Sequence, residues 1–152
     1  MYSRAESSRV RKEFWITMGK YMKPIPNAQG KRISWPNYKT GVKDIYFRMK
    51  AERDFASIGI ELCHADLVIQ EIYFEQFIQI KNILESTLQE EWDWKLREEN
   101  EFGQSISKIE LILEGVNIMN EEDWPQIISF LKPRIINLDK FWDLVKPGFE
   151  GF

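Results

Sequence analysis

The sequence predicts an α+β fold in which an antiparallel sheet of about four strands is covered on one face by helices. Apolar residues recur with the helical period near both ends of the chain and alternate with the strand period between them. Short turns, rather than crossover helices, join the paired strands. The predicted order is α-β-β-α-β-β-α in one domain over residues 1–152, with residues 1–8 expected to fray.

The first helix is predicted by an apolar stripe over residues 10–22, and Pro24 ends it because a residue before proline avoids the α region. The connection over residues 24–41 is rich in proline, asparagine and glycine, and alternation at Ile33 and Trp35 suggests a short strand within it. Such a long loop in a small domain is usually functional or ordered by packing.

A β-hairpin is predicted over residues 43–62, where two alternating apolar runs flank a tight turn at residues 52–53. The two runs place their apolar side chains on the same face of the sheet. The register set by this turn puts Asp44 opposite Glu61.

The remaining elements are a long helix over residues 66–88, strands over residues 92–97 and 109–113, and a final helix beginning near Asn120. Pro133 falls inside the final helix and predicts a kink or a break.

Several function classes are disfavoured by what the chain contains. The single cysteine, Cys63, excludes an internal disulfide framework and fits a reducing cytoplasm. The single histidine, His64, leaves few ways to build a zinc site or a histidine-based triad, and we expect it to be a partly buried or capping residue. No apolar run approaches the roughly 20 residues of a membrane span. No glycine-rich phosphate loop is present, so we expect no cofactor.

Charge is distributed unevenly along the chain, although its formal net value is only −3. Residues 1–53 hold 13 Lys+Arg and 4 Asp+Glu, whereas residues 54–152 hold 8 and 20. Basic residues with interleaved aromatic ones are typical of nucleic-acid surfaces. The predicted contact surface lies within residues 31–53 and comprises Arg32, Trp35, Tyr38, Lys39, Lys43, Tyr46, Arg48 and Lys50.

Two other interpretations of this asymmetry stay open. The basic helix and hairpin would neutralise the acidic region 85–101 within one copy, through surface salt bridges of little individual worth. Alternatively, the basic face of one copy meets the acidic face of a homodimer partner or another protein. We expect a non-catalytic interaction module, associated with nucleic acid, rather than an enzyme.

The enzyme hypothesis is metal-dependent phosphodiester cleavage at Asp44 and Glu61. Two carboxylates facing each other across a hairpin repel unless a cation, an arginine or a shared proton lies between them, and Mg²⁺ prefers carboxylate and water oxygens. A restriction-type nuclease strand carries an acid followed two positions later by lysine, whereas Glu61 is followed by Leu62 and Cys63. The nuclease hypothesis is therefore disfavoured.

Six stretches carry a resemblance to a known family: RKEFW at 11–15, WPNYKTG at 35–41, YFRM at 46–49, FEQF at 74–77, DWP at 123–125 and FLKPR at 130–134. Over roughly residues 9–150 the chain resembles an uncharacterised bacterial domain of unknown function, and most of all its small single-domain Bacteroidetes members. Similar domains stand at the C-terminal ends of proteins that look like nucleases or restriction-associated factors. The resemblance implies a link to nucleic acid and supplies no catalytic residues.

Overall fold

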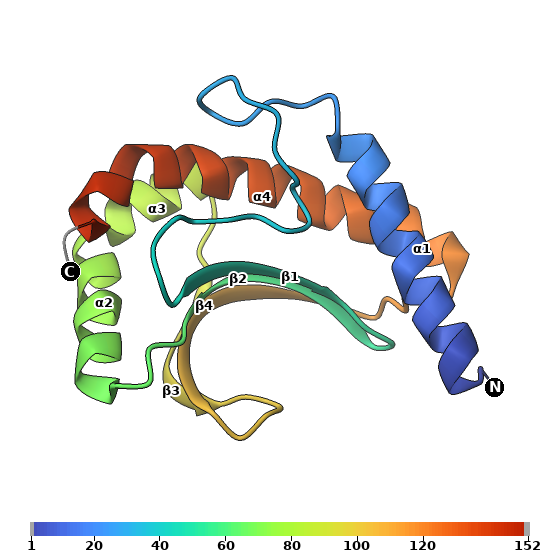
Figure 1. Ribbon diagram of the computed structural model, residues 1–152, viewed down its shortest axis with the longest axis horizontal. Coiled ribbons are helices and arrows are strands. Elements are labelled where there is room, and N and C mark those ends of the chain that lie inside the picture. Colours follow the sequence, from blue (N-terminus) through green and yellow to red (C-terminus); the bar gives the residue numbers. More distant parts are fainter. Residues whose placement is uncertain (1, 151–152) are drawn as a thin grey trace.

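The computed structural model describes residues 2–150 and shows a four-stranded antiparallel sheet with helices packed on one face (Figure 1), which confirms the predicted α+β class. The elements are α1 (Arg4–Met22), β1 (Ile45–Ala51), β2 (Phe55–Leu62), α2 (Leu67–Gln79), α3 (Lys81–Leu88), β3 (Asp93–Glu99), β4 (Ser105–Glu114), α4 (Trp124–Val145) and two short 3-10 helices, Glu121–Asp123 and Lys146–Phe149. No helix within this part of the chain is long and apolar enough to cross a membrane.

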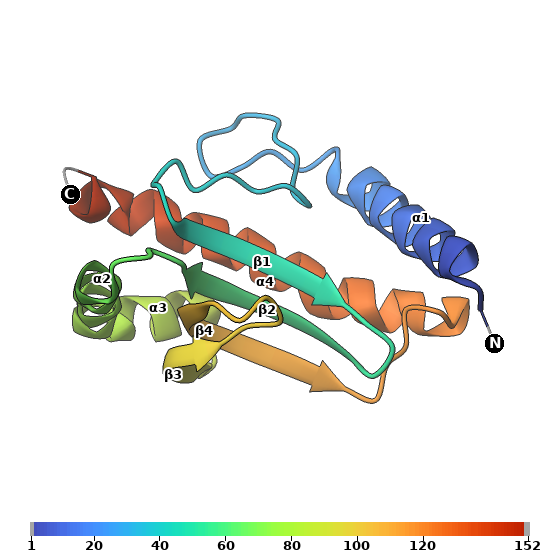
Figure 2. The same cartoon turned by 60° about the horizontal axis from the view of Figure 1, so that its bottom comes forward.

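The sheet has the strand order β1-β2-β4-β3 (Figure 2). Its central strand β2 is buried on both faces. The apolar face, with Ile58 and Ile60 at its centre, packs against α4, which crosses both β1 and β2. The sheet is strongly curved, and its concave face points away from α4, with the β3–β4 turn curling beneath it (Figure 1). The fold therefore offers a polar, hollowed face opposite its core.

The β1–β2 register differs by two residues from the predicted one. Ala51 pairs with Ala56, and the Glu52 N–H donates to the Phe55 carbonyl oxygen, so the two-residue turn lies at residues 53–54 and not at 52–53. Since side chains alternate with a period of two, this offset keeps the apolar face intact. It does, however, move Glu61 opposite Tyr46, and the predicted pairing of Asp44 with Glu61 is wrong.

The predicted helix over residues 66–88 is two helices, α2 and α3, which meet at Ile80. Their apolar residues cover more than half of a helical circumference, and one straight helix presents only one side to a core. By turning at Ile80, the chain buries Phe77 from α2 and Leu84 from α3 in the same core.

Three smaller predictions are corrected at the ends and interior of elements. Helix α1 begins at Arg4, because the Ser3 side chain accepts a bond from the Glu6 N–H, so residues 4–8 are helical rather than frayed; residue 1 lies outside the described residues. No strand forms at residues 33–35. Helix α4 does not break at Pro133, whose exposed position lets water satisfy the backbone carbonyl that proline leaves unpaired.

Close packing of the sheet predicts a stability effect at Gly59. A Cβ atom there would lie 2.8 Å from the Glu110 Cβ and 3.0 Å from the Ile109 carbonyl oxygen. We expect Gly59→Ala to lower the free energy of unfolding by about 1–3 kcal/mol in urea denaturation. The control is Gly19→Ala, whose Cβ would meet only Pro36 at 3.9 Å. This helical substitution should be neutral or stabilise by up to about 1 kcal/mol. Equal effects of the two substitutions would contradict the packing argument.

Candidate functional site

The long connection between α1 and β1, residues 23–44 (the connecting loop), is held against α4 by buried hydrogen bonds. The Trp142 indole N–H donates to the Thr40 carbonyl oxygen at 2.8 Å. Within the loop, the Trp35 indole N–H donates to the Ile25 carbonyl oxygen at 3.0 Å. Trp35 is only 1% exposed, contrary to its predicted place on an exposed contact surface. Its ring belongs to the core.

The strongest anchor of the connecting loop is the carboxylate of Asp139 on α4, which is 5% exposed. It accepts a bond from the Tyr38 hydroxyl at 2.6 Å and another from the Ala28 backbone N–H at 2.7 Å. Burial, and then this bond to Asp139, raise the pKa of Tyr38 far above its ordinary value. The Tyr38 ring also stacks on Phe47 at 5.1 Å. Tyr38 is therefore a structural anchor.

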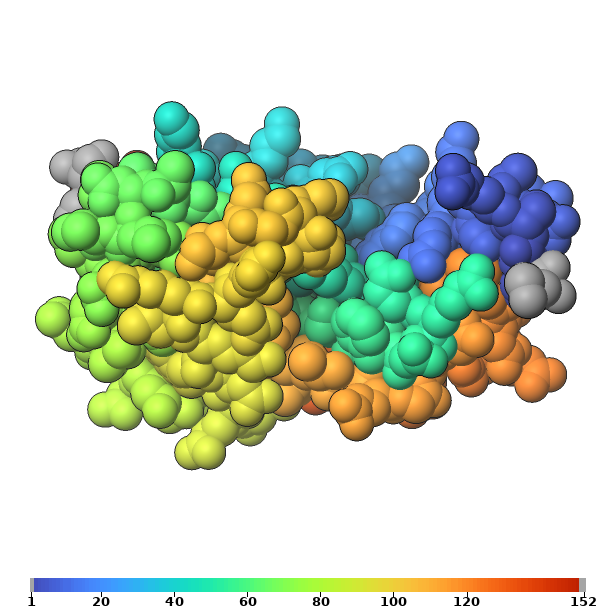
Figure 3. All heavy atoms as spheres, turned by 90° about the horizontal axis from the view of Figure 1, so that it is seen from below, coloured from blue at the N-terminus to red at the C-terminus, as the bar shows by residue number. Residues whose placement is uncertain are grey.

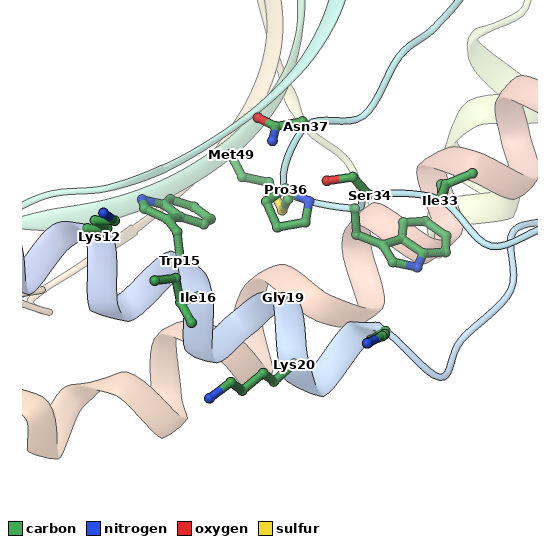
Figure 4. Close-up of a pocket in the computed structure, with 12 residues that line it drawn as sticks. Lys12, Trp15, Ile16, Gly19, Lys20, Ile33, Ser34, Pro36, Asn37 and Met49 are labelled. Atoms are coloured by element: carbon green, nitrogen blue, oxygen red, sulfur yellow. The ribbon is translucent and has the colours of Figure 1, made fainter.

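A groove of about 720 Å³ runs between α1 and the connecting loop (Figure 4). We call it the α1 groove; it is lined by Lys12, Trp15, Ile16, Gly19, Lys20, Lys23, Ile33, Ser34, Trp35, Pro36, Asn37 and Met49. Figure 4 shows Trp15 of α1 on one side, with Pro36 and Met49 beside it. The lining of the groove therefore combines aromatic and apolar side chains with lysine side chains.

The charge of the α1 groove is uncompensated. It is lined by three lysines and by no acidic residue. Within residues 2–150, none of these lysines has an ion-pair partner. Other cations on the same helix do, since Arg11 lies 2.6 Å from Glu52 and Arg9 lies 4.0 Å from Glu13. The groove is therefore a positively charged surface beside a partly exposed tryptophan.

A second hollow, of about 450 Å³, lies on the concave face of the sheet, where the β3–β4 turn overhangs β1 and β2 (Figure 3). We call it the sheet cavity. It brings together five of the predicted site residues and is lined by Asp44, Tyr46, Arg48, Lys50, Glu61, Cys63, Asn100, Glu101, Phe102 and Gln104. Phe102, at the turn, is 79% exposed.

In contrast to the α1 groove, the sheet cavity is neutralised from within. The Glu61 carboxylate lies 3.5 Å from the Arg48 Nε and 3.4 Å from the Lys50 Nζ. Lys50 also lies 3.9 Å from Glu101. The Arg48 guanidinium covers the Tyr46 ring at 4.3 Å from its centroid. Arg48 and Lys50 of the hairpin therefore have ion-pair partners within the same copy. Glu101 belongs to the acidic region 85–101 that was expected to supply such partners, whereas Glu61, on β2, does not.

The predicted contact surface thus does not form one patch. Tyr46, Arg48 and Lys50 lie in the sheet cavity, whereas Trp35 and Tyr38 anchor the connecting loop. Arg32, Lys39 and Lys43 are exposed on that loop and line neither hollow.

The candidate metal ligands Asp44 and Glu61 share the sheet cavity, but Glu61 already faces two cations. Across residues 2–150, no group of three or more His, Cys, Asp and Glu side chains is placed to hold a metal ion. Burial, and then the Glu61 carboxylate, raise the pKa of Cys63 to about 11, so its thiol is protonated at neutral pH. His64 is partly buried, as one of the two alternatives predicted, and its Nδ1 accepts a bond from the Asp66 N–H at 3.0 Å. The N-cap of α2 is Asp66, whose side chain accepts from the Val68 N–H.

The sequence analysis did not predict that the lining residues of the α1 groove come together in one groove. Lys12, Trp15, Lys20 and Lys23 all belong to the basic N-terminal third, and their spacing places them along one side of a helix. That spacing was the available signal. The opposite wall, around Pro36, comes from an irregular loop whose path no periodicity reveals.

Fold and site together define an α+β domain with a neutralised hollow on the open face of its sheet and a basic, aromatic groove beside its first helix. The chain matches the family described as "Domain of unknown function (DUF4268)" over residues 10–146, and it belongs to that family. Neither the curated proteins nor the solved structures contain a match.

The Asp139 anchor predicts a pH-dependent stability effect. Tyr38→Phe leaves the buried carboxylate without one of its two donors, and we expect a loss of about 1.5–3 kcal/mol in the free energy of unfolding at neutral pH. The raised pKa of Tyr38 means that only the unfolded state ionises near the ordinary value of 10.0. The stabilisation is therefore present below that pH and is lost as the pH rises above it.

Urea denaturation as a function of pH measures this effect, with the exposed Tyr21→Phe as control. The difference in the free energy of unfolding between the unmodified protein and Tyr38→Phe should become smaller at alkaline pH. A constant difference, or an equal loss in Tyr21→Phe, would show that the anchor does not act in this way.

Proposed function

We propose that this domain is a non-catalytic module that binds nucleic acid through the α1 groove. The observation that carries the proposal is the set of three lysines without acidic partners around Trp15. Phosphate contacts by lysine supply most of the affinity in sequence-independent binding. The partly exposed ring of Trp15 adds a stacking surface that accepts any base.

Single-stranded nucleic acid fits this groove better than a duplex. Stacking on Trp15 requires an unstacked base, and a single strand supplies one without the cost of opening base pairs. Lysine ammonium groups on flexible stems can follow an irregular backbone, because each acts as a point charge.

The sheet cavity is less suited to a phosphate backbone. Arg48 and Lys50 would have to leave Glu61, whose side chain is nearly buried and would then lose both of its cationic partners. The lysines of the α1 groove have no such partner to give up. For the same number of phosphate contacts, a nucleic-acid strand therefore gains more binding free energy in the α1 groove than in the sheet cavity.

Context from the sequence supports the same partner. The resemblance to domains that accompany nuclease-like and restriction-associated proteins is in keeping with a bacterial nucleic-acid-linked role. The single cysteine fits a cytoplasmic location, where nucleic acid is accessible.

Charge reversal in the groove tests the proposal. We expect Lys12→Glu with Lys20→Glu to weaken the binding of a single-stranded oligonucleotide, followed by fluorescence anisotropy over a range of salt concentrations. Loss of two phosphate contacts should make the slope of log K against log salt shallower by about 1.4.

The matched control is a double reversal at Lys132 and Lys140 on α4, which changes the net charge equally and leaves the groove intact. This control should retain most of the affinity. Equal weakening in both variants would mean that overall charge and not the groove drives binding, and the absence of salt-dependent binding by the unmodified protein would refute the proposal.

A further inference from the structure

Helix α2 turns an apolar stripe toward solvent. Its inner side buries Tyr73, Phe74 and Phe77, whereas Val68 and Ile72, one turn apart on the outer side, are 66% and 45% exposed. Leu67 and Ile78 also reach the surface. Among the described residues, no other element of the chain packs over this outer stripe, which borders a shallow hollow of about 520 Å³. Exposed apolar faces of this kind mark interaction sites.

Acidic residues border this stripe. Glu71 and Glu75 line the same shallow hollow as Val68 and Ile72, and no lysine or arginine lines it. Glu75 has no ion-pair partner within residues 2–150, and Glu71 has only the exposed Arg97 at 3.1 Å. The outer side of α2 is therefore apolar and negatively charged; we call it the α2 face.

The α2 face and the α1 groove are chemically complementary. Each has an apolar centre along a helix, Val68 and Ile72 in one and Trp15 and Ile16 in the other. Lysines border the groove, and glutamates border the α2 face. The two lie at opposite ends of the molecule (Figure 1), so they do not meet within one copy.

We propose that the α2 face of one copy of this chain docks into the α1 groove of a second copy, and that nucleic acid displaces it. The competition rests on the proposed function, whereas the docking does not. A helix laid in an apolar groove is a recurrent recognition mode, and the flanking glutamates would pair with groove lysines. Because the two surfaces differ, the contact is heterologous and forms either rings or open chains.

Sedimentation velocity with two charge-reversed variants tests the docking. One variant carries Lys12→Glu and Lys20→Glu, and the other carries Glu71→Lys and Glu75→Lys. At about 0.01 M salt, where the screening length is about 30 Å, the unmodified protein should associate as its concentration rises. Each variant alone should stay monomeric, since its two surfaces then carry like charge.

An equimolar mixture of the two variants should associate again, because each groove then meets an α2 face of opposite charge. Reversal of Lys132 and Lys140 should leave association unchanged, and circular dichroism of each variant verifies folding. A monomeric unmodified protein, a variant that associates alone, or a mixture that stays monomeric would each overturn the proposal.

A single-stranded oligonucleotide separates this inference from the proposed function. It should dissociate the unmodified protein, and it should bind the Glu71→Lys, Glu75→Lys variant at least as tightly, because that groove is intact and unoccupied. If the oligonucleotide binds the groove and leaves the association unchanged, the competition is refuted. If it binds neither protein, the proposed function fails, whereas the result with the mixed variants still decides the docking.

Discussion

The candidate site depends on one buried carboxylate. Asp139 on α4 holds two points of the connecting loop, more than 100 residues away in sequence, through the Tyr38 hydroxyl and the Ala28 N–H. Burying a charged group is costly unless it is fully hydrogen-bonded, so a buried aspartate that receives two short bonds strongly favours one position of the loop. The loop supplies one wall of the α1 groove, and α1 supplies the other. The shape of the groove therefore depends on contacts in the core and not on the surface lysines themselves.

The fold also separates cations that the sequence groups together. On β1 they extend over the concave sheet face, where Glu61 from the adjacent strand neutralises Arg48 and Lys50. On α1 and directly after it, Lys12, Lys20 and Lys23 line a groove whose other wall, the loop segment 33–37, contains no acid. The small net charge of −3 thus conceals one hollow whose cations are paired with carboxylates and one basic groove. Only the second has electrostatic free energy to gain from an anionic partner without first losing an internal ion pair.

The limits of prediction follow from the range of the interactions involved. Alternating apolar residues predicted the β1–β2 hairpin because the pattern is local, but its register depended on the position of the turn, which lies one residue later than expected and does not show in the pattern. The break at Ile80 between α2 and α3 arises from the direction of the core and not from a glycine or proline. The burial of Trp35 and the role of Tyr38 depend on α4, a partner that spacing does not reveal. Charge asymmetry directed attention to the N-terminal third, and the lysines that remain unpaired there could be identified only from the fold.

We propose that an anionic strand binds beside Trp15 in a groove whose walls are already in place. Nuclear magnetic resonance of the six tryptophan indole N–H groups during titration with a single-stranded oligonucleotide tests it most directly. We expect the Trp15 signal to shift most and the signal of the hydrogen-bonded Trp142 indole, which holds the loop to α4, to change little. Binding that leaves the Trp15 signal in place, or that shifts Trp142 as strongly as Trp15, would contradict it.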